Sequence, residues 1–155
     1  EKLTFNPDGT IQQLPFWTAK GVDPVGKLDP YRRVEAETIA WSEGLKTEKS
    51  EAGMYVTAIH DGDYIRVRNV DFKKGAKSFE AVVASASSGG QIEIRLDDKE
   101  GTLIGTCSID NTGGSESWKT FQAKTDKVKG VHDVYFIFKG GEDELFNFDC
   151  WRFVR

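Results

Sequence analysis

The sequence lacks several features that would place it in a familiar functional class. No block of basic residues occurs in the 155-residue chain and its net charge is −4, so we expect no binding to a nucleic-acid backbone, which requires clustered positive charge. No apolar run approaches the roughly 20 residues of a membrane-spanning helix, so we expect no membrane partner. The chain has neither an initiator Met nor a signal peptide. We interpret it as a piece of a longer, secreted protein, separated from its export signal.

Cysteine is also scarce, because Cys107 and Cys150 are the only two. Two cysteines allow one disulfide but do not argue for one, and no neighbouring cysteine or histidine gives the spacing of a zinc site. We favour the interpretation that both are small buried apolar side chains. The sequence leaves open whether they pair.

Proline is confined to the first 30 residues, which hold all four prolines of the chain. The run "TFNPDGTIQQLPF" predicts a strand, a turn and a second strand, with Pro-Asp-Gly as the turn. The run "AKGVDPVGKLDP" combines proline and glycine in the manner of a linker. We therefore predict that residues 1–30 form a linker or an extended arm from a preceding domain, and that residues 31–155 form one domain.

Helical periodicity is missing as well, and short runs with strand patterns fill the chain from Tyr31 onward. In "DYIRVRNVDF", for example, Ile65, Val67 and Asn69 are predicted to share one face. Roughly nine to ten such strands, separated by glycine-rich turns, predict an all-β fold. We expect an antiparallel β-sandwich of the jelly-roll type, with a barrel as the alternative.

The last predicted strand, "LFNFDCW", carries polar residues in an apolar run. Period two places Phe146, Phe148 and Cys150 on one face and Asn147, Asp149 and Trp151 on the other. Asn147 offers both a donor and an acceptor, which suits the paired hydroxyls of a sugar. The alternative is that Asn147 satisfies local backbone groups.

The run "RVEAETIAW" predicts a strand in which Glu35 and Glu37 point the same way. Two like charges so placed repel each other unless a positive charge lies between them. Calcium binds six to eight oxygen ligands, and Asp149 would supply a third carboxylate if the first and last strands are adjacent. A glycosidase acid–base pair fits less well, because the two glutamates are side by side rather than across a cleft. All three carboxylates could also be ordinary exposed charges.

Several motifs together resemble one known family. The runs "RVEAET", "GDYIRVRNVDF", "GTLIGTCSIDNTGGSESWKTF", "GVHDVYFIFKGG" and "LFNFDCW" are similar, in order, to family 6 carbohydrate-binding modules over Tyr31 to Arg155. These are non-catalytic β-sandwiches appended to plant-polysaccharide hydrolases. The N-terminal "TFNPDGTIQQL" is similar to the tail that follows a family 43 glycoside hydrolase, often an arabinofuranosidase or xylosidase.

The resemblance implies a structural Ca²⁺ site, with Glu35, Glu37 and Asp149 as carboxylate ligands and a loop carbonyl near Ser50 as a further one. It also implies a sugar cleft among the loops, in which Asn147 hydrogen-bonds a ring held between two aromatic faces. Ala58 and Ser115 occupy the positions of those faces. His60 or Trp118 would supply a face only if the register is shifted by a residue or two.

Some members of the family bind sugar in a second cleft, on the concave sheet surface. Its aromatic position corresponds to Tyr64, with Arg66 and Arg68 on the same face. Gln91, Glu93 and Arg95 would extend that surface from a neighbouring strand. The alternative is an ordinary solvated sheet face.

The favoured function is therefore that of a non-catalytic, monomeric module that targets a covalently linked hydrolase to xylan or arabinoxylan. The alternative is a degenerate module that binds little sugar and packs on its partner enzyme. A small glycosidase or lyase is disfavoured, because the sequence offers no acid–base pair from different strands.

Overall fold

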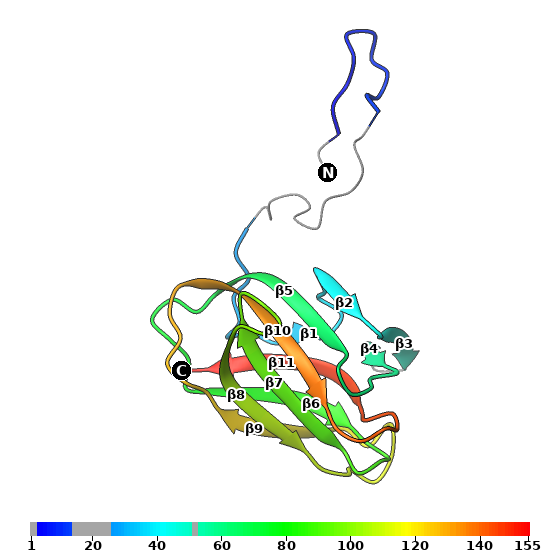
Figure 1. Cartoon of the computed structure of the whole chain (residues 1–155), viewed down its shortest axis with the longest axis vertical. Helices are drawn as coiled ribbons and strands as arrows, with labels where there is room; N and C mark the ends of the chain where they lie inside the picture. Colours follow the sequence, from blue (N-terminus) through cyan, green and yellow to red (C-terminus); the bar gives the residue numbers. More distant parts are fainter. Residues whose placement is uncertain (1–2, 14–25, 51–52) are drawn as a thin grey trace.

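The computed structural model describes residues 3–13, 26–50 and 53–155, and in these ranges the chain forms strands and no helix (Figure 1). The strands are β1 (Val34–Glu35), β2 (Trp41–Glu43), β3 (Lys46–Ser50), β4 (Gly53–Thr57), β5 (Tyr64–Asp71), β6 (Ser78–Ala84), β7 (Gly90–Leu96), β8 (Thr102–Ile109), β9 (Lys119–Lys124), β10 (Val131–Lys139) and β11 (Asn147–Val154). No helix in the described ranges could cross a membrane.

The strands form two antiparallel sheets, which confirms the predicted β-sandwich. One sheet has the order β3-β4-β11-β6-β9, and the short β1 also pairs with β11. The other has the order β2-β5-β10-β7-β8. The first and last strands are therefore adjacent, as required for Asp149 to lie near Glu35 and Glu37.

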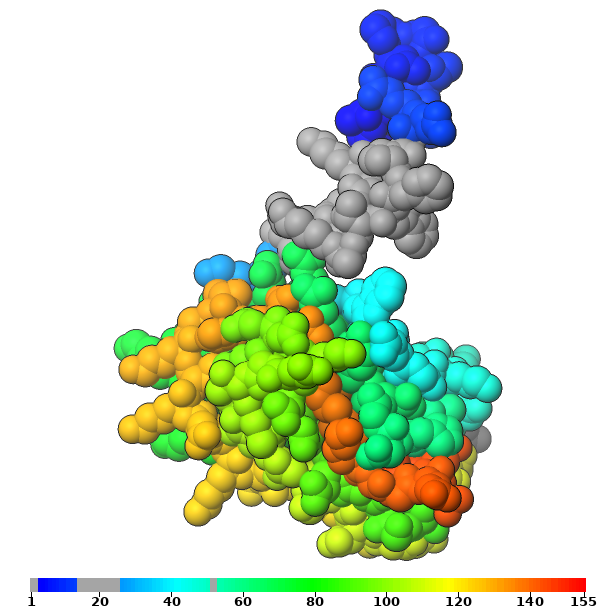
Figure 2. Space-filling model, in the orientation of Figure 1, coloured from blue at the N-terminus to red at the C-terminus, as the bar shows by residue number. Residues whose placement is uncertain are grey.

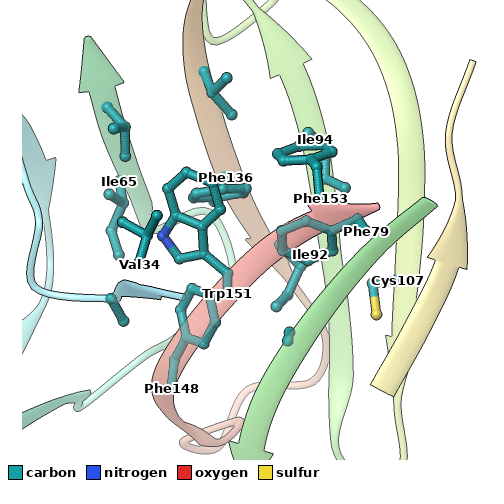
Figure 3. Close-up of a cluster of buried hydrophobic side chains, with 14 of the residues drawn as sticks. Val34, Ile65, Phe79, Ile92, Ile94, Cys107, Phe136, Phe148, Trp151 and Phe153 are labelled. Atoms are coloured by element: carbon teal, nitrogen blue, oxygen red, sulfur yellow. The ribbon is translucent and has the colours of Figure 1, made fainter. Parts of the chain in front are cut away.

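The core lies between the sheets and is rich in aromatic rings (Figure 3). Trp151 and Phe148 on β11 face Phe136 on β10, and the Trp151 and Phe136 ring centroids are 5.1 Å apart at 64°. Phe79 on β6 lies 5.4 Å from Phe136. Edge contacts of this kind stabilise a core beyond the burial of area alone.

An irregularity in β11 overturns one sequence prediction. The register between β11 and β6 shifts between Phe148 and Cys150, as at a β-bulge. Such an extra residue reverses the alternation that follows it. Trp151 is therefore 1% exposed and lies in the core with Phe148, not on the face of Asn147.

The inward face of β5 also departs from strict alternation. Asn69 has φ 55°, in the left-handed region that asparagine tolerates better than most residues. The next residue, Val70, is fully buried. The prediction that Asn69 joins Ile65 and Val67 on the core face is therefore wrong. The backbone changes direction at Asn69, and Val70 occupies the core position instead.

Both cysteines are free and buried, as expected for small apolar side chains. Cys107 belongs to the main core, and burial raises the pKa of its thiol to about 11. Burial raises the pKa of Cys150 to about 12, with a further contribution from the Asp149 carboxylate. Neither thiol is ionised near neutral pH, so neither is a reactive nucleophile.

The N-terminal segment contains the predicted turn. Phe5 and Ile11 form an antiparallel bridge, and Gly9 in the turn has φ 84°. The second predicted strand runs on into residues outside the described ranges, as does most of the predicted linker. Leu28 pairs with Val70 and packs against the core, so the described residues just before Tyr31 already contact the sandwich.

Candidate functional site

Four loops gather at one end of the sandwich, at the lower right of Figure 1. They are the connections 58–63, 85–89, 110–118 and 140–146. The Gly140 N–H donates to Asp61 Oδ1 (3.0 Å), and the Leu145 N–H donates to the Ile59 carbonyl (2.8 Å). These bonds tie loops from distant parts of the sequence into one surface.

A hollow of about 410 Å³ lies among these loops, and we call it the loop hollow. Its lining includes Ala84, Ala86, Ser87, Ser115, Glu144 and Asn147. Among the described residues of its lining the only aromatic one is Phe146, which is 3% exposed. The hollow therefore has the predicted Asn147 but no open aromatic face.

Asn147 is buried and already hydrogen-bonded on both sides of its amide. Its Oδ1 accepts from the Thr57 hydroxyl (2.7 Å), and its Nδ2 donates to the Ser115 carbonyl (2.8 Å). An asparagine amide has two N–H donors and two lone pairs, so these two bonds to described residues use one of each. Asn147 is thus both a tie between β4, β11 and the 110–118 loop and a preorganised polar group in the hollow.

Glu144 occupies the space beside Ala58, where an aromatic face was expected. Glu144 Oε1 accepts from the Ala58 N–H (3.2 Å) and lies 3.1 Å from the Thr57 hydroxyl. Ala58 has φ 55°. The loop hollow consequently presents a carboxylate where a stacking platform would stand.

Trp118 and His60 do not line the loop hollow. Trp118 is half-buried and meets the buried Tyr55 edge-on, with ring centroids 5.5 Å apart at 69°. His60 is exposed, and its Nδ1 lies 2.9 Å from the Ala58 carbonyl. Trp118 is placed as a packing residue, while His60 stabilises its own loop.

A second hollow, of about 330 Å³, lies on the exposed face of the five-stranded sheet, and we call it the sheet hollow. Figure 2 shows this side of the molecule, with β10 crossing it in orange. The lining includes Glu43, Tyr64, Glu93, Arg95, Lys99 and Ile137. Here the structure brings together three residues predicted for the second cleft: Tyr64, Glu93 and Arg95.

Tyr64 is 8% exposed, because neighbouring side chains cover its ring. The Tyr135 ring lies 6.1 Å away, and Lys99 Nζ lies 5.9 Å from the Tyr64 centroid. Lys99 is exposed and sits in a turn, so a ligand can displace its flexible chain without disturbing the sheet. Tyr64 is therefore a covered ring that becomes an aromatic floor when a ligand displaces Lys99.

Trp41 is the residue that sequence reasoning missed. It lies on β2 opposite Arg66 of β5, and it is 56% exposed. Burial and the Glu43 carboxylate raise the pKa of Tyr64, and hydrogen bonding from Trp41 opposes that rise, so the three side chains form one group. The sequence did contain a signal for it. In "IAWSEG" the tryptophan is surrounded by small and polar residues, which indicates an exposed ring.

Arg66 and Arg68, predicted to line the same surface, are held by one carboxylate. Arg66 donates to Asp133 Oδ2 through Nη2 (2.7 Å) and Nε (3.1 Å), and its guanidinium lies over the Tyr135 ring at 5.8 Å. Arg68 Nε lies 4.0 Å from the same Asp133 oxygen. These pairs fix the middle of the sheet face as a rigid polar floor.

The predicted metal ligands are only partly brought together. Arg33 donates to both oxygens of Glu35 (2.9 Å each) and to both oxygens of Asp149 (3.1 and 3.0 Å). Glu35 and Asp149 thus lie within reach of a single cation. The positive charge between the carboxylates in this structure is the Arg33 guanidinium, a partner that the sequence reasoning did not consider.

Glu37 lies apart from that pair. The strand ends at Glu35 and a turn follows, so the prediction of both glutamates on one strand is wrong. Glu37 Oε2 is buried and has no hydrogen-bond partner.

Ser50, near the predicted carbonyl ligand, lies at the end of β3, and its hydroxyl donates to the Gly53 carbonyl (3.2 Å). In the described ranges no three acidic, histidine or cysteine side chains are close enough to hold a metal.

Comparison with known proteins identifies the class of this sandwich. Residues 35–155 match the model of the carbohydrate binding module, family 6. The chain is therefore a non-catalytic, carbohydrate-binding β-sandwich. It belongs to the family 6 carbohydrate-binding modules, as its motifs indicated.

Two solved structures illustrate the similarity. A family 6 module from Clostridium cellulolyticum in complex with xylose is 43% identical, with a TM-score of 0.81 over 83% of this chain and 100% of that one. A family 43 arabinoxylan arabinofuranohydrolase from Bacillus subtilis in complex with cellotetraose is 44% identical, with a TM-score of 0.87 over 99% of this chain and 33% of that one.

Two curated relatives are whole enzymes. The arabinoxylan arabinofuranohydrolase of Bacillus subtilis (strain 168) is 46% identical over 162 residues, which cover 99% of this chain and 31% of the enzyme. The enzyme of the same name from Paenibacillus polymyxa is 40% identical over 161 residues, which cover 99% of this chain and 25% of that enzyme. The chain spans less than a third of the length of either relative.

Proposed function

We propose that this module binds xylan or arabinoxylan and holds a covalently linked arabinoxylan hydrolase on that polymer outside the cell. The observation that carries the proposal is the extent of the match. The two arabinoxylan enzymes align over 99% of the chain, including its N-terminal arm, whereas the family model begins only at residue 35. The arm is thus shared with whole hydrolases, which supports a hydrolase as its neighbour.

The sheet hollow is the site that the geometry favours for the sugar. Tyr64 gives an aromatic floor, and the exposed Trp41 lies on the adjacent strand β2, in the same group of side chains as Tyr64. Sugar rings carry C–H patches that pack against aromatic faces, while charged and polar groups around them meet the hydroxyls. Glu93 and Arg95 supply such groups, with Glu93 Oε2 2.9 Å from Arg95 Nε.

The loop hollow is the second candidate, and Asn147 is the observation in its favour. The second donor and second lone pair of its fixed amide point to a site already organised for a hydroxyl pair. Without aromatic faces, the loop hollow by itself should bind a sugar more weakly. Ser115→Trp would add such a face at its exposed rim and should raise the affinity.

Titration of the 155-residue chain with xylohexaose tests the sheet hollow. Tyr64→Ala should lower affinity by about fivefold or more, the effect of losing one aromatic contact of about 1 kcal/mol, while Tyr64→Phe keeps the ring and should bind nearly normally. If Tyr64→Ala binds normally and Asn147→Ala does not, the sugar is in the loop hollow.

The N-terminal arm supports an additional role in docking on the partner enzyme. Leu3, Phe5 and Ile11 are 52%, 60% and 59% exposed, and a lone hairpin is marginally stable in water. These exposed apolar side chains are suited to pack against a neighbouring domain. If the chain binds no arabinoxylan in affinity electrophoresis yet associates with the separately made hydrolase domain, packing is the main function and sugar binding has been lost.

We also propose that Ca²⁺ binds at Glu35 and Asp149 and that the ion draws in Glu37, which lies apart from them in this structure, with a carbonyl near Ser50 as a further ligand. Carboxylate oxygens are the ligands that Ca²⁺ prefers, and the buried, unpartnered Glu37 Oε2 suits a cation. Arg33 is about half exposed, so its side chain can leave the two carboxylates. A bound ion would stabilise the folded state. Chelation should therefore lower the melting temperature, and no change, with no calcium found by metal analysis, would refute the site.

A further inference from the structure

A third hollow, of about 510 Å³, borders the other two, and we call it the glycine trough. Its lining includes Ser88, Gly89, Gln91, Ser108, Lys139 and Gly141. Lys139 also lines the sheet hollow. Ser88 follows directly after Ser87 of the loop hollow. The three hollows therefore follow one another around the loop end of the sandwich, with Lys139 common to two of them and Ser87 and Ser88 at the boundary of the other two.

The strand geometry explains why the trough runs into the sheet hollow. Gln91 and Lys139 are opposite one another on β7 and β10, and Glu93 is opposite Ile137 one step further. Alternate residues of a strand share a face and lie about 7 Å apart. The trough and the sheet hollow are thus successive parts of the same exposed face.

Glycine keeps the wall between the trough and the loop hollow thin. A Cβ on Gly140 would collide with the Leu145 side chain, and one on Gly90 would lie 2.6 Å from the Lys139 carbonyl. Leu145 lines the loop hollow. Side chains at these glycines would push the neighbouring segments apart and raise the wall between the trough and the loop hollow.

The chemistry of the trough suits an uncharged polyhydroxyl ligand. Its side chains include the Gln91 amide and the Ser88 and Ser108 hydroxyls, all exposed. Two carboxylates, Asp61 and Asp110, outnumber the single Lys139 amine, so an anionic polymer would be repelled. Hydroxyl, amide and carboxylate groups together both donate to and accept from sugar hydroxyls.

We propose that one extended, uncharged glycan chain runs from the loop hollow through the glycine trough onto the sheet hollow. This rests on the proposed xylan binding and deepens it, because it assigns the trough as a binding surface. The module would bind a segment longer than either hollow holds. Affinity should therefore rise with chain length beyond a disaccharide.

Gly141 offers a direct way to block the trough. No heavy atom lies within 4 Å of a Cβ built there, and its φ is outside the left-handed region. Gly141 lines the trough and has room for a Cβ, so Gly141→Trp adds bulk at the trough. Gly26 has the same open surroundings but lies beside Asn69, near the far end of β5, so Gly26→Trp is a matched control.

The test is calorimetric titration of the 155-residue chain with xylobiose and xylohexaose. The wild type should bind the hexaose more tightly. Gly141→Trp should weaken hexaose binding by about tenfold, as expected for loss of one or two hydrogen bonds, and leave xylobiose binding within about twofold; Gly26→Trp should change neither. Gln91→Ala adds no bulk and should weaken hexaose binding about threefold, which keeps the test open if Gly141→Trp fails to fold.

The outcomes separate this inference from the proposed function. Unchanged hexaose affinity in folded Gly141→Trp and in Gln91→Ala would overturn the trough, as would equal wild-type affinity for the two sugars, while xylan binding would stand. Failure of the wild type to bind either sugar would overturn both.

Discussion

Asn147→Ala should destabilise the module even in the absence of sugar. The buried amide ties β11 to Thr57 on β4 and to the Ser115 carbonyl, at 2.7 and 2.8 Å. On its removal, the Thr57 hydroxyl can turn to Glu144 Oε1, 3.1 Å away, and water can reach the carbonyl of the exposed Ser115. Neither partner is left unsatisfied, so the cost is that of two hydrogen bonds, about 1–3 kcal/mol in all.

Urea unfolding and thermal melting measure this loss. A decrease of about 2 kcal/mol corresponds to a fall in Tm of about 4–8 °C for a domain of this size. A double-mutant cycle with Thr57→Val isolates the bond between the two side chains, and we expect a coupling of about 0.5–1.5 kcal/mol. A free energy of unfolding for Asn147→Ala within about 0.5 kcal/mol of wild type, with no coupling in the cycle, would refute the reasoning.

Three further predictions follow from other parts of the structure. Trp41→Ala should weaken xylohexaose binding by about fivefold, whereas Leu103→Ala, at the opposite edge of the same sheet, should not; equal effects would remove Trp41 from the site. Arg33→Met should lower Tm in the presence of chelator and much less with calcium, since the ion would replace the guanidinium between the carboxylates; a loss unaffected by calcium would mean that Arg33 is the permanent counter-charge. Burial acts to lower the pKa of His132, but hydrogen bonds to the Asp97 carboxylate (2.8 Å) and to a backbone carbonyl raise that pKa overall. The stability that this contact adds is therefore complete below the unfolded pKa of about 6.5 and is lost as the pH rises through the folded pKa. A His132→Gln variant whose free energy of unfolding has the same pH dependence as that of the wild type would contradict this prediction.

The sequence by itself determined the fold class, because the signals for strands and turns are local. In "QIEIRL", Ile92, Ile94 and Leu96 alternate with polar residues, and all three are buried in the structure. A residue's face on a regular strand depends only on its place in the alternation. Pro-Asp-Gly likewise defines the N-terminal turn without help from the rest of the chain. The order of such motifs was enough to indicate the family.

Tertiary structure alone decided which side chains meet. Arg33 lies between Glu35 and Asp149, although Asp149 is 116 residues away in sequence, and Trp41 reaches the Tyr64 group because β2 pairs with β5. The bulge in β11 turned Trp151 into the core, which no alternation rule anticipates. Pairing and register join strands that are distant in the chain, and their energies depend on how both sheets pack together. The presence of sugar-binding and cation-binding residue types could therefore be predicted from the sequence, but their partners could not.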